Sequence, residues 1–455
     1  MQDTVKCVLD RAALESAGRT ALRFKQKGQW KTYTYRRLHL RARRVAQLCA
    51  NLGVKPGDRV AIYRENSPEW FELYYGIVGL GAVAVPVDAK LREQEVSHIF
   101  RDCGVSAAFC SPKNAEILND LNDRLHRLKS IVLLDESYEQ QLPEDAGAYD
   151  LHDPQPDDPA SFIYTSGTTG RQKGAVLTHR NFVSNVRSCQ KAIDIHKSDN
   201  FLLVLPLHHS FAFTTSLLLP AFVQCEISMV ENLKTIKANM QETSPTVLLA
   251  VPLLLEKMLA RIQAGIQQKA MARVLFKAGL AKVIGRKIHR ELGGALRLIV
   301  SGGAPIDPDT LRAWNKLGFP IIEGYGITET GPVLSLNPPD APRPGTVGLP
   351  LPDVQIQILN PGPDGSGEIA AKGPNVMAGY YNNAQATEEC LQDGWFHSGD
   401  LGFFDDAGYL VINGRKKSLI VNREGKNIYP EEIEQQVAKS PTILECLALG
   451  YREPG

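Results

Sequence analysis

A run of small polar residues near the middle of the chain has the composition of a phosphate-binding loop. The run consists of Thr165, Ser166, Gly167, Thr168, Thr169 and Gly170. Their backbone N–H groups and hydroxyls can bind a polyphosphate, the glycines permit close approach, and Lys173 adds a positive charge. The alternative is a flexible hairpin turn. No Lys-Ser or Lys-Thr pair follows the second glycine, so the run is not a Walker A loop.

Further glycine-rich or charged motifs follow between this run and the end of the sequence. They occupy residues 301–305, 324–330, 394–402, 414–417 and 425–430. In content and order, the whole set resembles the motifs of the adenylate-forming (AMP-binding) superfamily. This superfamily includes acyl-CoA synthetases, luciferases and the adenylation domains of peptide synthetases. The stretch 425–434 is most similar to long- and medium-chain fatty acyl-CoA synthetases.

The resemblance implies a reaction in two steps, with ATP, Mg²⁺ and CoA as cofactors. A carboxylate attacks the α-phosphate of ATP and magnesium pyrophosphate leaves. The thiol of CoA then attacks the acyl-adenylate. The protein must hold two anions together and stabilise the charge that develops in each transition state.

The resemblance also assigns roles to residues around the phosphates. The loop 165–170 and Lys173 would hold the β- and γ-phosphates, and Thr328 would donate to the α-phosphate. Glu329 would hold Mg²⁺, a hard cation that prefers oxygen ligands. Taken alone, Glu329 could equally be a solvated loop acid.

Other motif residues would hold the nucleoside. The adenine slot would lie between the segment Gly303, Ala304 and Pro305 and the stacked ring of Tyr325, with Gly324 and Gly326 on either side of that tyrosine. Asp400 would accept hydrogen bonds from the ribose hydroxyls, and Arg415 would add a ribose or phosphate contact. The alternatives are a core aromatic for Tyr325, an Asx-turn residue for Asp400 and a surface residue for Arg415.

The acid and the thiol should meet near residues 205–211. His209 resembles the family's histidine at the junction of the acyl pocket and the thiol tunnel, although a structural role is the alternative. No Asp or Glu occurs in 201–224, and a buried ammonium without a partner is costly, so an amino-acid substrate is disfavoured. The apolar run 211–222 fits either a lipophilic pocket or ordinary core. Lys417 resembles the hinge residue, and Gly425 would lie by the CoA tunnel.

Composition describes an ordinary globular protein of several subdomains. The 455 residues exceed what one core supports, and 43% are hydrophobic. A net charge of +1, with no long basic run, gives no indication of nucleic acid. Eight scattered cysteines and the absence of a secretory signal favour the cytoplasm. The longest uncharged apolar stretch, 73–87, is too short for a membrane span, and peripheral membrane association stays open.

Short apolar strands that alternate with helices predict an α/β fold. We expect two doubly wound αβα subdomains, at 1–155 and 156–337. A small antiparallel β-barrel should follow at 338–413, and the start of a small α+β domain at 414–455, with a last strand at 446–450. Thr34 and Thr178 are the expected N-caps of two helices.

Two positions depart from the family pattern, and so does the end of the sequence. Gln172 replaces the usual proline, and Ser418 replaces the usual acid after Lys417. The family's C-terminal domain continues further and carries a lysine that serves adenylation, so the truncated sequence is expected to adenylate poorly. The predicted function is an AMP-forming acyl-CoA ligase for a medium- or long-chain fatty acid. The alternatives are an acyl-(acyl carrier protein) ligase and an impaired nucleotide- or acyl-binding homologue.

Overall fold

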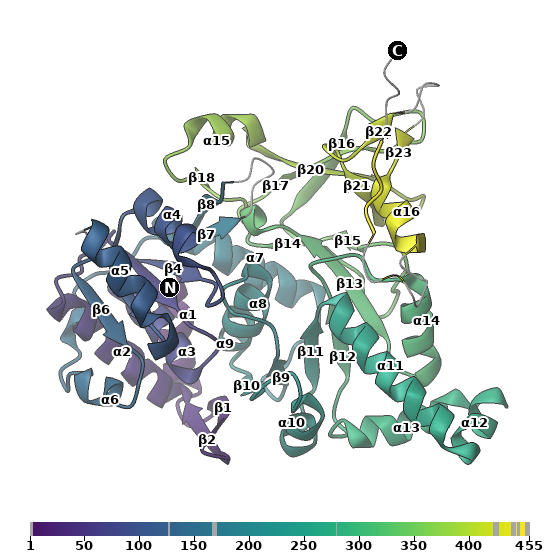
Figure 1. The fold of residues 1–455 in the computed structure, drawn as a ribbon, viewed down its shortest axis with the longest axis horizontal. Helices are drawn as coiled ribbons and strands as arrows, with labels where there is room; N and C mark the ends of the chain where they lie inside the picture. The colour runs from purple at the N-terminus through teal and green to yellow at the C-terminus, as the bar shows by residue number, and fades with distance from the viewer. Residues whose placement is uncertain are drawn as a thin grey trace.

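In the computed structural model, two large β-sheets alternate with layers of helices (Figure 1). The structure describes residues 3–125, 128–165, 171–278, 280–421, 427–437, 443 and 446–450. We name the large sheets after central strands, the β4 sheet and the β11 sheet. Each has helices on both faces, and the helices between the sheets belong to a hydrophobic core shared by both.

The β4 sheet is built from short strands that are mostly apolar. Its strand order is β18-β8-β7-β4-β3-β5-β6, with parallel pairing from β7 through β6 and antiparallel pairing of β8 with both neighbours. The strands are β3 (Arg59–Tyr63), β4 (Val83–Val87), β5 (Val105–Cys110), β6 (Ser130–Leu133), β7 (Pro159–Thr165), β8 (Lys173–Thr178) and β18 (Gly379–Tyr380). Parallel strands buried on both faces explain why these segments are apolar without alternation.

The β11 sheet has the order β15-β14-β13-β12-β11-β9-β10-β1-β2. Its strands are β1 (Thr20–Gln26), β2 (Gln29–Thr34), β9 (Asn200–Leu203), β10 (Glu226–Met229), β11 (Val247–Ala250), β12 (Leu298–Ser301), β13 (Ile321–Gly326), β14 (Val333–Leu336) and β15 (Leu349–Pro350). Pairing is parallel from β1 to β13 and antiparallel at both edges.

The layer of helices between the sheets comes from both halves of the sequence. It contains α1 (Val5–Glu15), α2 (Tyr35–Asn51), α3 (Pro68–Gly79), α7 (His179–Ala192), α8 (Ser210–Phe213), a π-helical turn (Thr214–Leu218) and α9 (Leu219–Val223). Ring packing connects the two halves, because Tyr74 of α3 lies 4.5 Å from Phe213 of α8 between ring centroids.

The outer layers cover the remaining face of each sheet. Helices α4 (Glu93–Cys103) and α5 (Ala115–Leu125) cover the β4 sheet. The β11 sheet is covered by α10 (Ile236–Thr243), α11 (Pro252–Gln268), α13 (Ala281–Glu291) and α14 (Pro308–Leu317), with α12 (Ala270–Lys277) between α11 and α13. The short helix α6 (Tyr138–Gln141) follows β6.

Both predicted helix caps are confirmed. The Thr34 hydroxyl accepts a hydrogen bond of 3.2 Å from the Arg37 N–H at the start of α2. Thr178 does the same for the Asn181 N–H of α7, also at 3.2 Å. These bonds satisfy N–H groups that have no partner within the first turn of a helix.

The two large sheets exchange strands. β1 and β2 join the β11 sheet, whereas β7 and β8 join the β4 sheet. Each large sheet therefore contains strands from both sides of the expected boundary at 155/156. The four subdomain ranges remain predictions from the sequence.

A smaller antiparallel sheet follows the β11 sheet and lies above it in Figure 1. Its strands are β16 (Gln355–Leu359), β17 (Gly367–Lys372), β19 (Leu391–Gln392), β20 (Trp395–Phe404) and β21 (Leu410–Arg415), with α15 (Ala384–Cys390) beside them. Beyond it lie the strand pair β22 (Ile420–Val421) and β23 (Asn427–Ile428), and α16 (Pro430–Val437). The predicted fold class is confirmed.

One expected element is wrong. Residues 446–450 form no strand, and the Ala448 N–H donates instead to the Glu434 carboxylate of α16 at 2.8 Å. Within the described residues, no helix combines the length and apolar character needed to cross a bilayer.

Candidate active site

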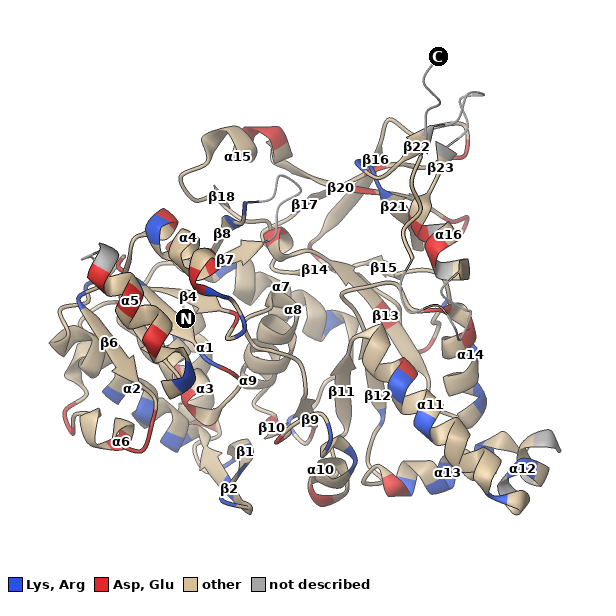
Figure 2. Cartoon of the chain, in the orientation of Figure 1, with Lys and Arg blue, Asp and Glu red and all other residues tan. Residues whose placement is uncertain are grey.

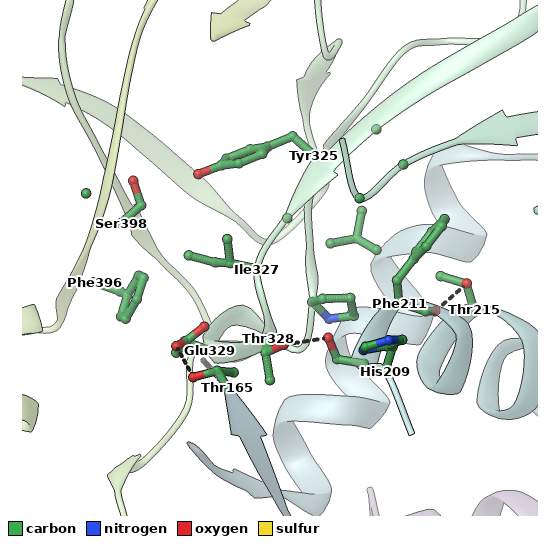
Figure 3. Close-up of a pocket in the computed structure, with 18 of the residues that line it drawn as sticks. Thr165, His209, Phe211, Thr215, Tyr325, Ile327, Thr328, Glu329, Phe396 and Ser398 are labelled. Atoms are coloured by element: carbon green, nitrogen blue, oxygen red, sulfur yellow. Dashed lines mark hydrogen bonds between the residues drawn. The ribbon is translucent and has the colours of Figure 1, made fainter. Parts of the chain in front are cut away.

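A cavity of about 840 Å³ opens where the β4 sheet, the β11 sheet and the smaller antiparallel sheet approach one another (Figure 3). Many of the predicted site residues line it, although they come from widely separated motifs. They are Thr165, Lys173, His209, Gly303, Gly324, Tyr325, Gly326, Thr328, Glu329, Arg415 and Lys417.

The other predicted residues fall into three groups. Asp400 is buried behind the lining and bonds directly to two residues in it. Ala304 and Pro305 are exposed beside Gly303 and do not belong to the described lining. Ser166, Gly167, Thr168, Thr169, Gly170 and Gly425 lie outside the described residues, so their assigned roles remain predictions.

Glu329 is held by side chains from the β4 sheet. Its Oε1 accepts a hydrogen bond of 2.7 Å from the Tyr380 hydroxyl of β18 and one of 3.3 Å from the Thr165 hydroxyl of β7. Lys173 extends over the same tyrosine, with its Nζ 5.2 Å from the ring centroid. Within the described part of the chain no donor binds Glu329 Oε2, so this oxygen can take a cation.

Asp400 is only 5% exposed and is held by two neighbours. The Tyr325 hydroxyl donates to its Oδ2 at 2.6 Å, and Arg415 Nε lies 3.2 Å from its Oδ1. Asp400 and Arg415 stand opposite each other on β20 and β21, and this register explains their contact. Burial raises the pKa of Asp400, although the bonds from Tyr325 and Arg415 oppose the rise.

Positive charge gathers on one side of the cavity. Lys173, Arg415, Lys416 and Lys417 all line it. Lys416 Nζ pairs with Glu368 Oε2 at 2.8 Å, and the Glu368 Oε1 accepts from the Gly399 N–H at 3.2 Å. These contacts fix the loop that follows β21 against β17 and β20.

A second cavity, of about 290 Å³, adjoins the first. The two share the residues Thr165, His209, Ser210 and Thr328 in their linings. The hydroxyl oxygens of Ser210 and Thr328 are hydrogen-bonded at 2.9 Å, as Figure 3 shows. This shared wall lies between the motif that begins at 324 and the segment 205–211.

Two neighbouring histidines stand at this wall. The Nε2 atoms of His208 and His209 are 3.1 Å apart, and His208 Nε2 lies 3.5 Å from Asp88 Oδ2. Burial and the neighbouring His209 lower the pKa of His208 to about 4, and burial also lowers the pKa of His209. Both rings are therefore neutral at pH 7 and can accept as well as donate hydrogen bonds.

The opposite end of the main cavity is apolar. It is lined by Cys189, Ile193, Leu205, Phe211, Leu219, Leu249, Val251, Val300, Val333 and Leu336. Gly302 packs closely against the Phe211 ring at this end, and a Cβ at position 302 would lie only 3.0 Å from that ring. Among the described lining residues, the only carboxylates are Glu329, Glu368 and Glu389, and they belong to the polar end.

Sequence reasoning missed several residues at the polar end. Tyr380 binds Glu329, and Glu368 binds Lys416, while Cys390 also lines the cavity. Glu368 lies within the predicted β-barrel range, but its partner Lys416 is 48 residues further along the chain. Nothing in its local pattern marks Tyr380, because its role depends on β18 joining β8 across about two hundred residues.

Comparison with known proteins agrees with this arrangement. Residues 9–381 match the model of the AMP-binding enzyme family, and the chain belongs to that family. The resemblance of the motifs is thereby confirmed.

Individual relatives are similar over most of their length. The long-chain-fatty-acid–CoA ligase FadD15 of Mycobacterium bovis is 30% identical over 466 aligned residues, which cover 94% of this chain and 76% of that protein. A feruloyl-CoA synthase of an Amycolatopsis species is 31% identical, with 92% and 81% covered. Among solved structures, ATP-bound MatB from Rhodopseudomonas palustris has a TM-score of 0.84 at 29% identity, covering 98% of this chain and 85% of that one.

Proposed function

We propose that this protein is an AMP-forming acyl-CoA ligase that activates an apolar carboxylic acid, preferably a medium- or long-chain fatty acid. One observation carries the proposal. A single cavity joins a cation-rich end, which contains Glu329 and adjoins Asp400, to an apolar end whose described lining has no carboxylate, and His209 lines the same cavity. Family membership and the CoA ligases among the relatives support the same reaction class.

The polar end fits a nucleoside triphosphate. Lys173, Arg415, Lys416 and Lys417 supply positive charge, and the positive φ of Gly303 (+83°) lets the backbone turn beside the cavity without a side chain. The hydroxyl of Tyr325 is already committed to Asp400, so its ring is held in one orientation against a base. ATP-bound MatB is a structural neighbour, which supports ATP as the nucleotide.

Glu329 fits a magnesium ion. Its Oε1 accepts hydrogen bonds from Tyr380 and Thr165, and Oε2 would ligate the hard cation. Bound Mg²⁺ would neutralise charge on the pyrophosphate as it leaves. Tyr380 and Thr165 orient the carboxylate for this task.

The chemistry requires little beyond positioning. A carboxylate oxygen of the acid attacks the α-phosphorus, and the bond from that phosphorus to the bridging oxygen of pyrophosphate breaks. In this proposal Thr328 would donate to the α-phosphate, and the cations would stabilise the charge on it. The CoA sulfur then attacks the acyl carbon and AMP leaves. His209, a neutral ring that lines both cavities, would admit the thiol from the smaller one.

The apolar end favours a substrate without charge on its tail. An α-amino group would be buried there without a carboxylate partner, and that is costly. FadD15 acts on long-chain fatty acids, and the feruloyl-CoA synthase acts on an aromatic acid. We place this protein with the fatty acid ligases because its lining is mainly aliphatic.

The decisive experiment measures pyrophosphate release from Mg-ATP with acetate, octanoate, palmitate, benzoate and an amino acid, with and without CoA. Mass spectrometry of acyl-AMP and acyl-CoA accompanies it. We expect release with octanoate and palmitate, acyl-AMP without CoA, and thioester with CoA. Substituting a holo carrier protein for CoA tests the acceptor.

A binding assay with acyl-sulfamoyl adenosines of the same acids measures occupancy of the site without requiring turnover. We expect the octanoyl and palmitoyl compounds to raise the thermal midpoint most. No stabilisation by any of them, together with no pyrophosphate release, would overturn the proposal. Preference for the aminoacyl compound would overturn the substrate class.

A further inference from the structure

Three strands of the β4 sheet end at the cation-rich end of the main cavity. β7 ends at Thr165, β8 begins at Lys173, and β18 contains Tyr380. Thr165 and Tyr380 donate hydrogen bonds to Glu329, and Lys173 lies over the ring of Tyr380. The position of these strand ends therefore decides where the candidate metal ligand and the neighbouring cation lie.

The positive charge at this end comes from two elements of the chain. Figure 2 shows basic (blue) segments at β8 and at β21, and the cation that β8 brings to the described lining is Lys173. Lys173 pairs in register with Thr165 across β7 and β8. A shift of these two strand ends would therefore move the Lys173 cation and a hydrogen-bond donor of Glu329 together.

Helix α4 contacts the start of β8 through His98. The Nε2 atom of His98 lies 2.8 Å from the carbonyl oxygen of Gln172, the residue directly before Lys173. A carbonyl oxygen only accepts hydrogen bonds, so Nε2 of His98 carries a proton and donates it. This hydrogen bond fixes the backbone from which the Lys173 side chain extends.

The same helix contacts the ends of β7 and β18 through Asp102. The hydroxyl of Tyr164, the residue directly before Thr165, donates to Asp102 Oδ2 at 2.6 Å. The Tyr164 ring packs over Gly174 of β8, where a Cβ would lie 3.0 Å from it. Asn382, just after β18, donates to the Asp102 carbonyl oxygen at 3.3 Å. Helix α4 is therefore bonded to the ends of all three strands.

Helix α4 is itself fixed in place, so it can hold the strand ends. His98 and Asp102 are four residues apart, a spacing that puts both side chains on one face of a helix. At the start of the helix the Arg92 N–H donates to Glu95 Oε2 at 3.0 Å, and at its end Gly104 takes the left-handed conformation (φ +61°). The helix packs on the β4 sheet through buried side chains, which are Val96, Ile99, Phe100 and Cys103.

We propose that His98 and Asp102 are positioning residues for the binding of Mg-ATP, because they tie the strand ends around Glu329 to the rigid helix α4. The inference rests on the proposed function, which supplies the triphosphate and the metal ion for these strand ends. Neither residue belongs to the described lining of either cavity. They would therefore act through Gln172 and Tyr164 and not by touching the nucleotide.

A positioning role predicts a selective effect on the ligand. The strand ends held by α4 carry the groups assigned to the metal ion and the β- and γ-phosphates, whereas Asp400 and Tyr325, assigned to the nucleoside, belong to β20 and β13. Loosening the contacts of α4 should therefore weaken Mg-ATP and spare metal-free AMP. A residue that served only the folding of the protein would affect both nucleotides equally.

The test titrates Mg-ATP and metal-free AMP separately into the full chain by calorimetry. We expect His98→Leu to raise the Kd of Mg-ATP by about 3- to 10-fold, the usual effect of losing one hydrogen bond, with the Kd of AMP unchanged. His98→Gln should restore the affinity for Mg-ATP, because its amide can still donate. Asp102→Leu should weaken Mg-ATP like His98→Leu, and Asp102→Asn, which keeps a carbonyl acceptor, should bind like the parent chain.

A matched control changes another neutral side chain of the same helix. Gln94 is exposed on α4, so Gln94→Leu should bind both nucleotides like the parent chain. Thermal midpoints verify the folding of each variant, and hydrogen exchange at residues 172–174 should be faster in His98→Leu than in His98→Gln.

The two proposals fail in different chains of this experiment. Unchanged Mg-ATP affinity in His98→Leu and Asp102→Leu, or equal losses for Mg-ATP and AMP, would overturn the positioning role while the parent chain still binds Mg-ATP. A parent chain that binds neither nucleotide would overturn the proposed function, and this inference with it.

Discussion

At the scale of single residues, Tyr380 is the most informative side chain that the sequence did not mark. Its hydroxyl holds Oε1 of Glu329 at 2.7 Å, and its ring supports Lys173. It touches no reacting atom in the proposed mechanism, so it is a positioning residue for the carboxylate that would hold Mg²⁺.

Removing this hydroxyl should weaken the binding of Mg²⁺ and leave the nucleoside site intact. Tyr380→Phe is expected to raise the Mg²⁺ concentration needed for tight ATP binding by about 10- to 100-fold, the usual effect of losing a group that orients a metal ligand. Calorimetric titration of ATP across Mg²⁺ concentrations measures it, with metal-free AMP binding as control. A variant that loses AMP binding to the same degree would show that Tyr380 acts only on folding.

Glu323 is a second residue whose environment has a measurable consequence. It is a buried acid of β13, and burial raises its pKa to about 7 from 4.5. The native state therefore binds a proton between these values that the unfolded state has already released. Stability is highest below about pH 4.5 with respect to this group, and falls as pH rises towards 7.

We expect Glu323→Gln to abolish this part of the pH dependence. The change in stability between about pH 5 and pH 8 should be smaller in the variant by about 1 to 3 kcal/mol. Thermal midpoints at both pH values measure it, compared with the exposed-acid control Glu388→Gln. If both variants follow the parent profile, the Glu323 carboxylate is ionised in the native protein across this range.

At the scale of elements, the contact between α13 and α14 depends on a glycine, Gly285 of α13, which has no side chain. A Cβ at Gly285 would lie 1.7 Å from the Leu317 carbonyl oxygen, so the helices touch through their backbones. Gly265 of α11 is also helical, but a Cβ there would meet no atom within 4 Å. The two glycines therefore differ in surroundings rather than in backbone conformation.

Gly285→Ala should destabilise the protein, while Gly265→Ala should not. The added methyl group would force α13 away from α14, which should lower the free energy of unfolding by about 1 to 3 kcal/mol or more. Alanine at 265 should instead gain up to about 1 kcal/mol from its better helix propensity. Thermal midpoints of the two variants measure the contrast, and equal midpoints would mean that α13 shifts freely on α14.

The elements predicted best are those whose signal is local. The α/β fold class could be predicted because short apolar runs, such as that of β3 at Arg59–Tyr63, are bounded by turn residues. The caps at Thr34 and Thr178 could also be predicted from the sequence, because a helix cap depends only on the first turn of its own helix. The candidate site was found largely through motif resemblance, which brought distant residues such as Thr165 and Arg415 into one prediction.

Features that rest on distant pairing could not be predicted in this way. The pattern of β1 does not indicate that it pairs with β10 rather than with β3, because a strand pattern specifies a face and not a neighbour. For the same reason the role of Tyr380 could not be predicted, because it depends on the pairing of β18 with β8. Ala304 and Pro305 show a further limit, since a motif does not tell which of its residues face the cavity.

At the scale of the whole molecule, strand exchange makes the two halves one folding unit. Tyr35 donates to the Cys225 carbonyl at 2.6 Å, and Arg23 pairs with Glu226 at 2.6 Å, both across the boundary at 155/156. The core between the sheets contains residues from both sides.

Cutting the connector should therefore not separate the halves. Leu151 is 85% exposed, so a protease site inserted between Leu151 and His152 is accessible. After cleavage we expect the fragments 1–151 and 152–455 to elute together in native gel filtration and to separate in denaturant. Fragments that separate without denaturant would show that each half is stable alone.

The exchange of strands also bears on the order in which the chain is made. β1 is among the first segments synthesised, yet Leu22 pairs in register with Ile227 of β10, which is made about two hundred residues later. At ordinary rates of translation this interval lasts about 10 to 40 s. Throughout it, the apolar side chains of Ala21, Leu22 and Phe24, all buried in the finished protein, have no sheet to join. The strand β1 is thus a natural client for chaperones until β10 has been made.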